Sequence, residues 1–316
     1  MRCLYCNKPI ADNATEQEKA RCWHTKCIKK FFGTSKFPQI DISDENLIEI
    51  ANESTNNGFT VPGVQKKLSL HFEGGSKPRL TLSNYPTGYI LKPQTEDHEA
   101  MPEAEFLVMN MAKVTGIKTV PFALVKLDGG YAYITRRIDR EGGEMLAMED
   151  FCQLEERLTQ DKYKGSYERC AKLICKYSER KGFDLSELFL RLVFGFVTGN
   201  SDMHLKNFSL IEEGAGSQRY VLSAAYDLLP VNAILPEDTE QFALTINGKK
   251  RNIRKKDFLI FAENAGIPAS AAQKIISDVI SLESTYIAMC KESYLPEKLK
   301  TVLLDIITSR TQILRG

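Results

Sequence analysis

Alternating apolar and polar positions characterise the chain just after residue 67. Leu68–Phe72 alternates and is followed by Gly74 and Gly75, a pattern typical of a strand that ends in a turn. The short segments Arg79–Ser83 and Gly88–Lys92 predict two more strands. We therefore expect a β-rich region in this part of the chain.

A helix and a hairpin are expected next. Pro102–Thr115 has helical character, with Pro102 near its first turn and Gly116 just beyond its end. Val120–Leu127 and Tyr131–Thr135 predict two strands around the turn residues 128–130. This part of the chain therefore continues the β-rich region and adds one long helix.

The periodicity changes to helical after about residue 140. The predicted helices are Leu146–Thr159, Ser166–Arg180, Leu185–Thr198, Lys256–Ala265, Ser270–Leu282 and Pro296–Leu314. Two short strands, Phe208–Ile211 and Tyr220–Leu222, interrupt them. A β-rich lobe over residues 34–138 and a helical lobe over 139–316 predict an α+β fold, with a ligand-binding cleft between the lobes. A short helix is also expected at Glu45–Glu53.

The chemistry of the helical lobe centres on Asp202 and Asn207, a carboxylate and an amide five residues apart. Protein kinases place a catalytic Asp and a magnesium-binding Asn at this separation. Lys206 lies between them, where it would steady a transferring phosphoryl group. Asp227 follows the predicted strand at 220–222 and would bind magnesium directly. A lone Asp is more often a loop or cap residue, so the prediction rests on the whole set.

The β-rich lobe contributes two weaker signals. Lys92 ends an apolar strand, where its ammonium group would reach ATP phosphates, although lysines at strand ends are common. The segment from Val61 to Lys66 contains a single glycine, Gly63, and taken alone is no more than a turn.

These motifs together resemble a known family. The segments VPGVQKKLSL, YILKPQ, ITRRIDR, MEDFCQL, GNSDMHLKNFSL and AYDLLP are similar, in order and spacing over residues 58–260, to the HipA family of bacterial Ser/Thr kinases. The resemblance implies a two-lobed protein-kinase-like fold, dependence on ATP and Mg²⁺, and the role of toxin in a toxin–antitoxin pair.

The resemblance also implies roles for individual residues. The catalytic residues would be Asp202 as base, Lys206 and the catalytic-loop His204, with Asn207 and Asp227 as magnesium ligands. The nucleotide would contact Lys92, the phosphate-covering loop of Val61, Pro62, Gly63, Val64, Gln65 and Lys66, the hinge of Arg136, Arg137 and Ile138, and Tyr226. A structural hydrogen-bonding role for His204 is an equal alternative. Glu105 or Glu103, both expected to be exposed, would pair with Lys92.

Thr60 occupies the position at which family members carry a self-phosphorylated Ser. The family's Ser-Ile-x-Gly reads Thr-Val-Pro-Gly here. Thr accepts phosphate as Ser does, whereas Pro62 restrains the backbone of the loop. Self-inactivation by phosphorylation of Thr60 is therefore a hypothesis.

Residues 1–33 form a separate Cys-rich unit. Cys3-x₂-Cys6 and His24-x₂-Cys27 have the spacing of two zinc-ligand pairs, and Cys22 is a spare thiol or an alternative to His24. Four protein ligands would make the zinc structural. The alternative is a group of reduced thiols in a mobile N-terminus, and the family pattern does not require this metal.

Composition and charge narrow the setting. Hydrophobic residues make up 43% and charged residues 26% of 316 residues, which is typical of a globular protein. No apolar run approaches the ~20 residues of a membrane span, so we expect a cytoplasmic protein without membrane association. The net charge of +1 gives no global field for nucleic acid, and the basic residues within 249–256 are typical of a solvated surface.

The resemblance further implies partners. Family members carry a larger N-terminal subdomain than the about 57 residues that precede the phosphate-covering loop here, so this chain is similar to short relatives that use a separate small protein in its place. A helix-turn-helix antitoxin would be a partner and would provide the link to DNA. A translation-related protein such as an aminoacyl-tRNA synthetase would be the substrate. The alternatives are a non-catalytic protein- or nucleic-acid-binding regulator and a small-molecule kinase.

Overall fold

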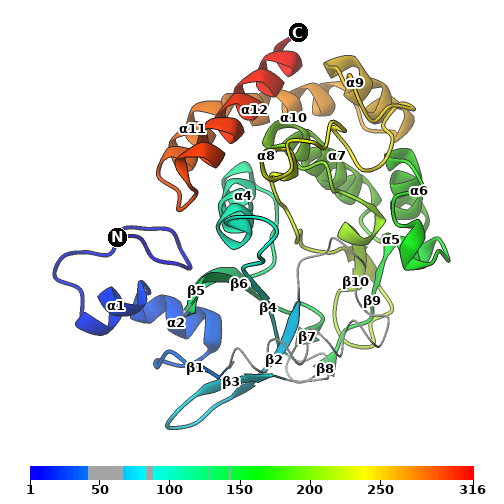
Figure 1. The fold of residues 1–316 in the computed structure, drawn as a ribbon. Coiled ribbons are helices and arrows are strands. Elements are labelled where there is room, and N and C mark those ends of the chain that lie inside the picture. The colour runs from blue at the N-terminus through cyan, green and yellow to red at the C-terminus, as the bar shows by residue number, and fades with distance from the viewer. Residues whose placement is uncertain (42–66, 83–87, 128, 142–143) are drawn as a thin grey trace. The chain divides into compact units, whose positions relative to one another are not determined.

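The computed structural model describes residues 1–41, 67–82, 88–127, 129–141 and 144–316. The chain divides into two compact units (Figure 1). Unit 1 comprises Met1–Phe106 and Val120–Arg137, and unit 2 comprises Leu107–Thr119 and Ile138–Gly316. Within these described ranges, no helix is both long enough and apolar enough to cross a bilayer. The mixture of strands and helices confirms the predicted α+β class.

Unit 1 is built on a six-stranded sheet in the order β1-β3-β2-β4-β6-β5. Its strands are β1 (Gln39–Asp41), β2 (Leu68–Glu73), β3 (Arg79–Leu82), β4 (Tyr89–Pro93), β5 (Phe122–Leu127) and β6 (Gly130–Arg136). All pairings are antiparallel except that of β1 with β3. The five strands predicted between residues 68 and 135 are confirmed. The predicted helix at Glu45–Glu53 lies outside the described residues.

The N-terminal segment packs on this sheet rather than standing apart. It contains two short helices, α1 (Glu16–Arg21) and α2 (Thr25–Phe32), which the sequence analysis missed. The indole N–H of Trp23 donates to the Leu124 carbonyl at 3.2 Å, and the Leu124 amide donates to the Leu4 carbonyl at 2.8 Å. These two contacts satisfy backbone groups along the outer edge of β5.

Helix α4 (Met101–Thr115) matches the predicted helix and belongs to both units. Its last turn ends at Gly116, whose φ of +91° is accessible to glycine at low cost. The side chains of its middle turns, including Phe106 and Val108, are almost fully buried. This helix carries Glu105 toward the sheet of unit 1.

Unit 2 is mainly helical. Its helices and 3₁₀ turns are α5 (Phe151–Leu154), η1 (Thr159–Asp161), α6 (Tyr167–Tyr177), α7 (Lys181–Thr198), η2 (Leu205–Asn207), α8 (Val231–Ile234), α9 (Lys255–Asn264), α10 (Ala269–Ser281), α11 (Glu283–Lys291) and α12 (Glu297–Arg315). Helix α7 is buried from Leu188 onward apart from one position and packs against α6, α10 and α12. The predicted helices in these regions are confirmed, except the first, and α11 was missed.

The remaining strands of unit 2 are short. Strands β9 (Met148–Asp150), β10 (Ser209–Glu212) and β11 (Tyr220–Leu222) form an antiparallel sheet with β10 in the middle. A two-stranded ribbon consists of β7 (Arg140–Glu141) and β8 (Glu144–Met145). The two strands predicted from the sequence in this unit correspond to β10 and β11.

The predicted helix at Leu146–Thr159 is wrong over most of its length. Its first residues pair as β9 with β10, because Leu146 packs with Ile211 and Val221 in a small apolar cluster. Asp150 then caps α5, and its carboxylate accepts from the Gln153 amide at 2.9 Å. Apolar residues spaced as in a helix therefore form a strand, which is followed by a single capped helical turn.

Candidate active site

The loop Gly199–Ser209 begins at the C-terminal end of α7. Gly199 ends the helix with a φ of +76°, and a Cβ atom placed there would lie 3.1 Å from Ile306. The Asn200 amide closes the turn on the Gly195 carbonyl at 2.8 Å. The buried helix α7 thus fixes the position in unit 2 at which the polar loop begins.

Asp202 is the most accessible functional group of this loop, with 46% of its side chain exposed. Its Oδ1 accepts a hydrogen bond of 2.8 Å from the Tyr163 hydroxyl, and its Oδ2 lies 3.9 Å from Nε2 of His204. His204 is buried and its ring meets the Tyr163 ring edge-to-face at 5.1 Å. A solvent-accessible carboxylate is therefore held between a phenol and an imidazole.

Asn207 and Asp227 lie side by side, although twenty residues separate them. Nδ2 of Asn207 is 3.3 Å from Oδ2 of Asp227, and Oδ1 of Asn207 accepts from the His204 amide at 3.0 Å. Asp227 adopts a φ of +60°, a sparsely populated conformation that clusters at functional sites. The amide oxygen of Asn207 and the carboxylate of Asp227 are both oxygen ligands of the kind that Mg²⁺ prefers, so the pair fits such an ion in chemistry.

Lys206 and Tyr226 connect this loop to its surroundings. Lys206 forms an ion pair of 2.7 Å with Asp150, the last residue of β9. The Tyr226 hydroxyl contacts Oγ of Ser209 at 2.5 Å and donates to the Lys206 carbonyl at 3.0 Å. Burial raises the pKa of Tyr226, which keeps its hydroxyl protonated. Asp150 was not predicted from the sequence, because its role depends on a partner more than fifty residues away.

The rear of the loop is fixed by a second network. The backbone N–H of Asn232 donates to the Gly199 carbonyl at 3.0 Å, and Oδ1 of Asn232 accepts from Arg310 of α12 at 2.5 Å. Arg310 also donates to the Phe196 carbonyl at 2.8 Å. Ser201 donates to Asp238 at 2.6 Å. These contacts immobilise the start of the loop from behind, and none was predicted.

In unit 1, Lys92 of β4 forms a buried ion pair with Glu105 of α4. The Lys92 ammonium group lies 2.7 and 2.9 Å from the two carboxylate oxygens and 5.3 Å from the centre of the Tyr133 ring. Glu105 has no exposed surface, contrary to the expected exposure, while burial raises the pKa of Glu103. The structure therefore selects Glu105 over Glu103 as the partner of Lys92.

Glu105→Gln is expected to lower the free energy of unfolding by about 3–5 kcal/mol, because the Lys92 ammonium group would be left buried without its counter-charge. Urea denaturation measures this loss. Glu99→Gln, at an exposed position near the start of the same helix, is the matched control and should change stability by less than about 0.5 kcal/mol. A similar loss in both variants would contradict a special role for the pair.

Of the other residues predicted to contact the nucleotide, some lie within the described residues and some lie outside them. Arg136 is the last residue of β6, its amide donates to the Pro121 carbonyl, and the division between units falls between Arg137 and Ile138. Ile138 packs against the cluster that contains Leu146. Thr60 and the segment 61–66 lie outside the described residues, so their predicted roles stay predictions.

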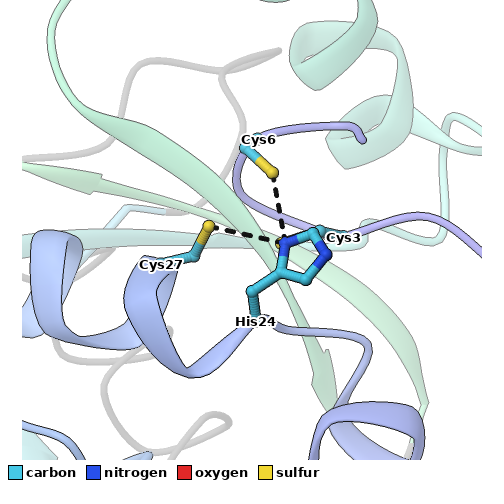
Figure 2. Close-up of side chains that lie close together, drawn as sticks. All are labelled: Cys3, Cys6, His24 and Cys27. Carbon is cyan, nitrogen blue, oxygen red and sulfur yellow. Dashed lines mark hydrogen bonds between the residues drawn. The ribbon is translucent and has the colours of Figure 1, made fainter. Parts of the chain in front are cut away.

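A second group of functional side chains lies in the N-terminal segment of unit 1. Ligand atoms of Cys3, Cys6, His24 and Cys27 all lie within 4.8 Å of one another, and Figure 2 shows Cys6 and Cys27 pointing toward the same edge of the His24 ring. The hydrogen-bonded turn that starts at Cys3 brings the first pair together, and Cys27 lies in the first turn of α2. The four predicted ligands therefore converge.

The spacing and orientation of this cluster fit tetrahedral zinc. Nδ1 of His24 is 3.4 Å from the Cys6 sulfur and 3.7 Å from the Cys27 sulfur, against about 3.6 Å between sulfur and nitrogen ligands of one zinc ion. Nε2 of His24 lies 3.2 Å from the Pro9 carbonyl, the contact that orients a metal-binding imidazole. The Cys22 thiol instead donates a hydrogen bond to the Lys19 carbonyl at 3.6 Å, so Cys22 does not replace His24.

Comparison with known families gives one match that covers most of the chain. The sequence model of the HipA-like C-terminal domain matches residues 59–285. This range includes Lys92, the loop Gly199–Ser209 and Asp227, but not the Cys-rich segment.

Curated relatives of the chain are named as kinases. The protein named "Putative kinase Y4dM" from Sinorhizobium fredii is 30% identical over 70% of this chain, and one named "Putative kinase" from Haemophilus influenzae is 25% identical over 93%. The chain covers 56% of the Sinorhizobium protein and 92% of the Haemophilus protein. The match thus spans little more than half of the Sinorhizobium protein and nearly all of the Haemophilus protein.

Two solved structures share the fold. HipA from Shewanella oneidensis, in a complex of HipA, HipB and operator DNA, matches with a TM-score of 0.67 and 19% identity over 85% of this chain and 72% of that one. The proinflammatory kinase CtkA from Helicobacter pylori matches with a TM-score of 0.54 and 14% identity over 78% of this chain and 94% of that one. Both similarities concern the fold.

Proposed function

Because the chain belongs to the family of the HipA-like C-terminal domain, we propose that it is a protein Ser/Thr kinase that transfers a phosphoryl group from Mg-ATP to a protein hydroxyl. One observation carries this proposal: the accessible Asp202 carboxylate shares a loop with Asn207, and Asn207 contacts Asp227. A base next to two magnesium ligands is the arrangement that phosphoryl transfer requires.

In the proposed mechanism, Asp202 accepts the proton of the attacking hydroxyl, because its side chain is 46% exposed and a carboxylate serves as a general base. His204 holds the carboxylate from the buried side, at 3.9 Å from Oδ2. Lys206 exchanges its contact with Asp150 for the transferring phosphoryl group. Magnesium on Asn207 and Asp227 would neutralise the charge that develops on the phosphate oxygens.

Lys92 provides the remaining cation for the nucleotide. Its ion pair with Glu105 fixes the ammonium group at the end of β4, and such a Lys–Glu pair is required in protein kinases. Backbone groups of Arg136, Arg137 and Ile138 would contact adenine, and the segment 61–66 would cover the phosphates. These assignments rest on the similarity to the family.

The proposed reaction predicts where labelled phosphate appears. After incubation with Mg-ATP labelled at the γ-phosphate, radioactivity should be found on protein, including this chain itself, and phosphopeptide mapping should place the self-modification on Thr60. Label on a metabolite instead would support a small-molecule kinase. Label on this chain at positions other than Thr60 would overturn the self-inactivation hypothesis alone.

The partners follow from the relatives. The Shewanella HipA structure contains HipB and operator DNA, which supports a role as toxin with a DNA-binding helix-turn-helix antitoxin as partner. We propose as further partners a small protein similar to the family's N-terminal subdomain, and a translation-related substrate such as an aminoacyl-tRNA synthetase. A nucleic-acid role for residues 249–256 has less support, because Lys249 and Lys250 pair with Asp257 and Glu240.

We also propose that Cys3, Cys6, His24 and Cys27 hold a structural zinc ion. The four ligands leave no open coordination position for a substrate. The knuckle they form lies against β5, so the metal would stabilise the sheet that carries Lys92.

A further inference from the structure

Tyr163 makes a contact that the proposed mechanism does not use. It follows η1 in the segment before α6, and its hydroxyl donates to Oδ1 of Asp202 at 2.8 Å. Its ring rests against His204, and the Lys162 ammonium group lies 4.9 Å from its centre. The side chain is nevertheless 44% exposed, so the phenol is placed specifically without being buried.

The hydrogen bond from Tyr163 to Asp202 is of the same kind as the one that a substrate hydroxyl would donate to Asp202. A Ser or Thr hydroxyl that is to be phosphorylated must donate its proton to Asp202, as the phenolic hydroxyl does here. An oxygen of Asp202 engaged by Tyr163 is less able to activate a water molecule. Since the Tyr163 ring is half exposed and its segment is held by the Leu205 amide on the Lys162 carbonyl, the side chain can turn away while the backbone stays in place.

The surroundings keep Tyr163 a donor. Partial removal of the hydroxyl from water, and then the nearby carboxylates of Asp202, Asp238 and Asp227, raise its pKa, so it stays protonated at any physiological pH. Of the residues that the structure describes, His204 and Lys162 also contact this pair. The hydroxyl therefore remains available to occupy the carboxylate until a stronger competitor arrives.

We propose that Tyr163 is an acceptor-site gate: its hydroxyl occupies Asp202 in place of the substrate hydroxyl and gives way only to a protein hydroxyl, not to water. This inference rests on the proposed kinase function and adds a specificity-determining residue to it. The gate suppresses futile ATP hydrolysis, because water lacks the flanking peptide contacts needed to displace the phenol.

The test uses the full chain with Mg-ATP as the only substrate, so that water is the acceptor. Tyr163→Phe should raise the kcat of ATP hydrolysis about tenfold, the order of effect of losing one hydrogen bond to a charged group, and leave the KM for ATP unchanged. Tyr163→Leu, which also lacks the hydroxyl donor, should raise the kcat of ATP hydrolysis as well. Tyr177→Phe, an exposed tyrosine at the end of α6, should have no effect.

A pH profile separates the gate from a purely structural role. A hydrogen bond donated to a carboxylate favours its charged form, so its loss should raise the pKa of the acidic limb of kcat/KM in Tyr163→Phe. An unchanged or lower kcat, or an unmoved acidic limb, overturns the gate. Asp202→Asn distinguishes this result from failure of the proposed function: if ATP turnover persists in Asp202→Asn, the kinase mechanism itself is wrong.

Discussion

Asp202→Asn should reduce phosphoryl transfer to protein by about a thousandfold or more, since loss of a general base costs 10²–10⁴-fold and the amide cannot accept the substrate proton. The substitution preserves the size and planar shape of the side chain and keeps one oxygen that can accept a hydrogen bond. Mg-ATP affinity should stay within a few-fold, because Lys92, Asn207 and Asp227 are untouched. Single-turnover transfer assays and nucleotide-induced thermal shifts measure the two quantities.

The matched control is Asp278→Asn. Asp278 lies on the exposed face of α10, where it pairs with Lys274 at 2.6 Å, and the same chemical change there should leave the transfer rate unaffected. If Asp202→Asn retained more than a tenth of the wild-type transfer rate, Asp202 would not be the base. If ATP affinity were lost together with the rate, Asp202 would belong to the nucleotide site instead.

Removal of zinc should have the largest effect on stability. Structural zinc sites contribute about 10–16 kcal/mol of apparent binding free energy in isolated fingers, so Cys27→Ser should abolish stoichiometric metal and lower the melting temperature of unit 1 by about 10 °C or more. Plasma emission spectrometry counts the metal, and calorimetry follows unfolding. Chelation of the wild-type protein should reproduce the variant.

Cys175→Ser is the control for this experiment, because Cys175 is an exposed cysteine outside the cluster. It should retain one zinc ion per chain and the wild-type melting temperature. A wild-type protein purified without metal, and equally stable with and without added zinc, would contradict the proposal. The cluster would then consist of reduced cysteines around a histidine.

The sequence predicts best what short-range spacing encodes. Asp202 and Asn207 lie on one loop, and the Cys3–Cys6 and His24–Cys27 pairs each lie within one turn, so their local geometry follows from residue order. Asn207 and Asp227 were both expected to bind magnesium, and in the structure Asn207 comes shortly before β10 while Asp227 follows its antiparallel neighbour β11. These elements needed no knowledge of distant packing.

Contacts over long range were not predictable in this way. Tyr163, Asp150 and Arg310 act on the loop from other elements. Tyr163 and Arg310 lie in no quoted motif, and the segment MEDFCQL, which contains Asp150, did not indicate a contact with Lys206. Glu105 was expected to be exposed because charge normally indicates a surface position. Its full burial depends on Lys92, a residue of another element that compensates its charge.

The errors in secondary structure have a similar cause. The segment after residue 145 has apolar residues at spacings that suit a helix, but β10 offers it backbone partners. Helices α1 and α2 were missed because they are short and depend on caps and on packing around Trp23. Pairing and tertiary packing therefore decided the structure of segments whose own periodicity is weak.

The contacts of Leu4 and Trp23 with Leu124 bear on how the protein behaves in a crowded cell. An edge strand with unpaired backbone groups is a template for self-association, and here the knuckle covers those groups in the middle of β5. If the knuckle opened, the strand would become available to a second copy or to a misfolded chain. Metal starvation or thiol oxidation would then produce aggregates, and not simply a less active protein.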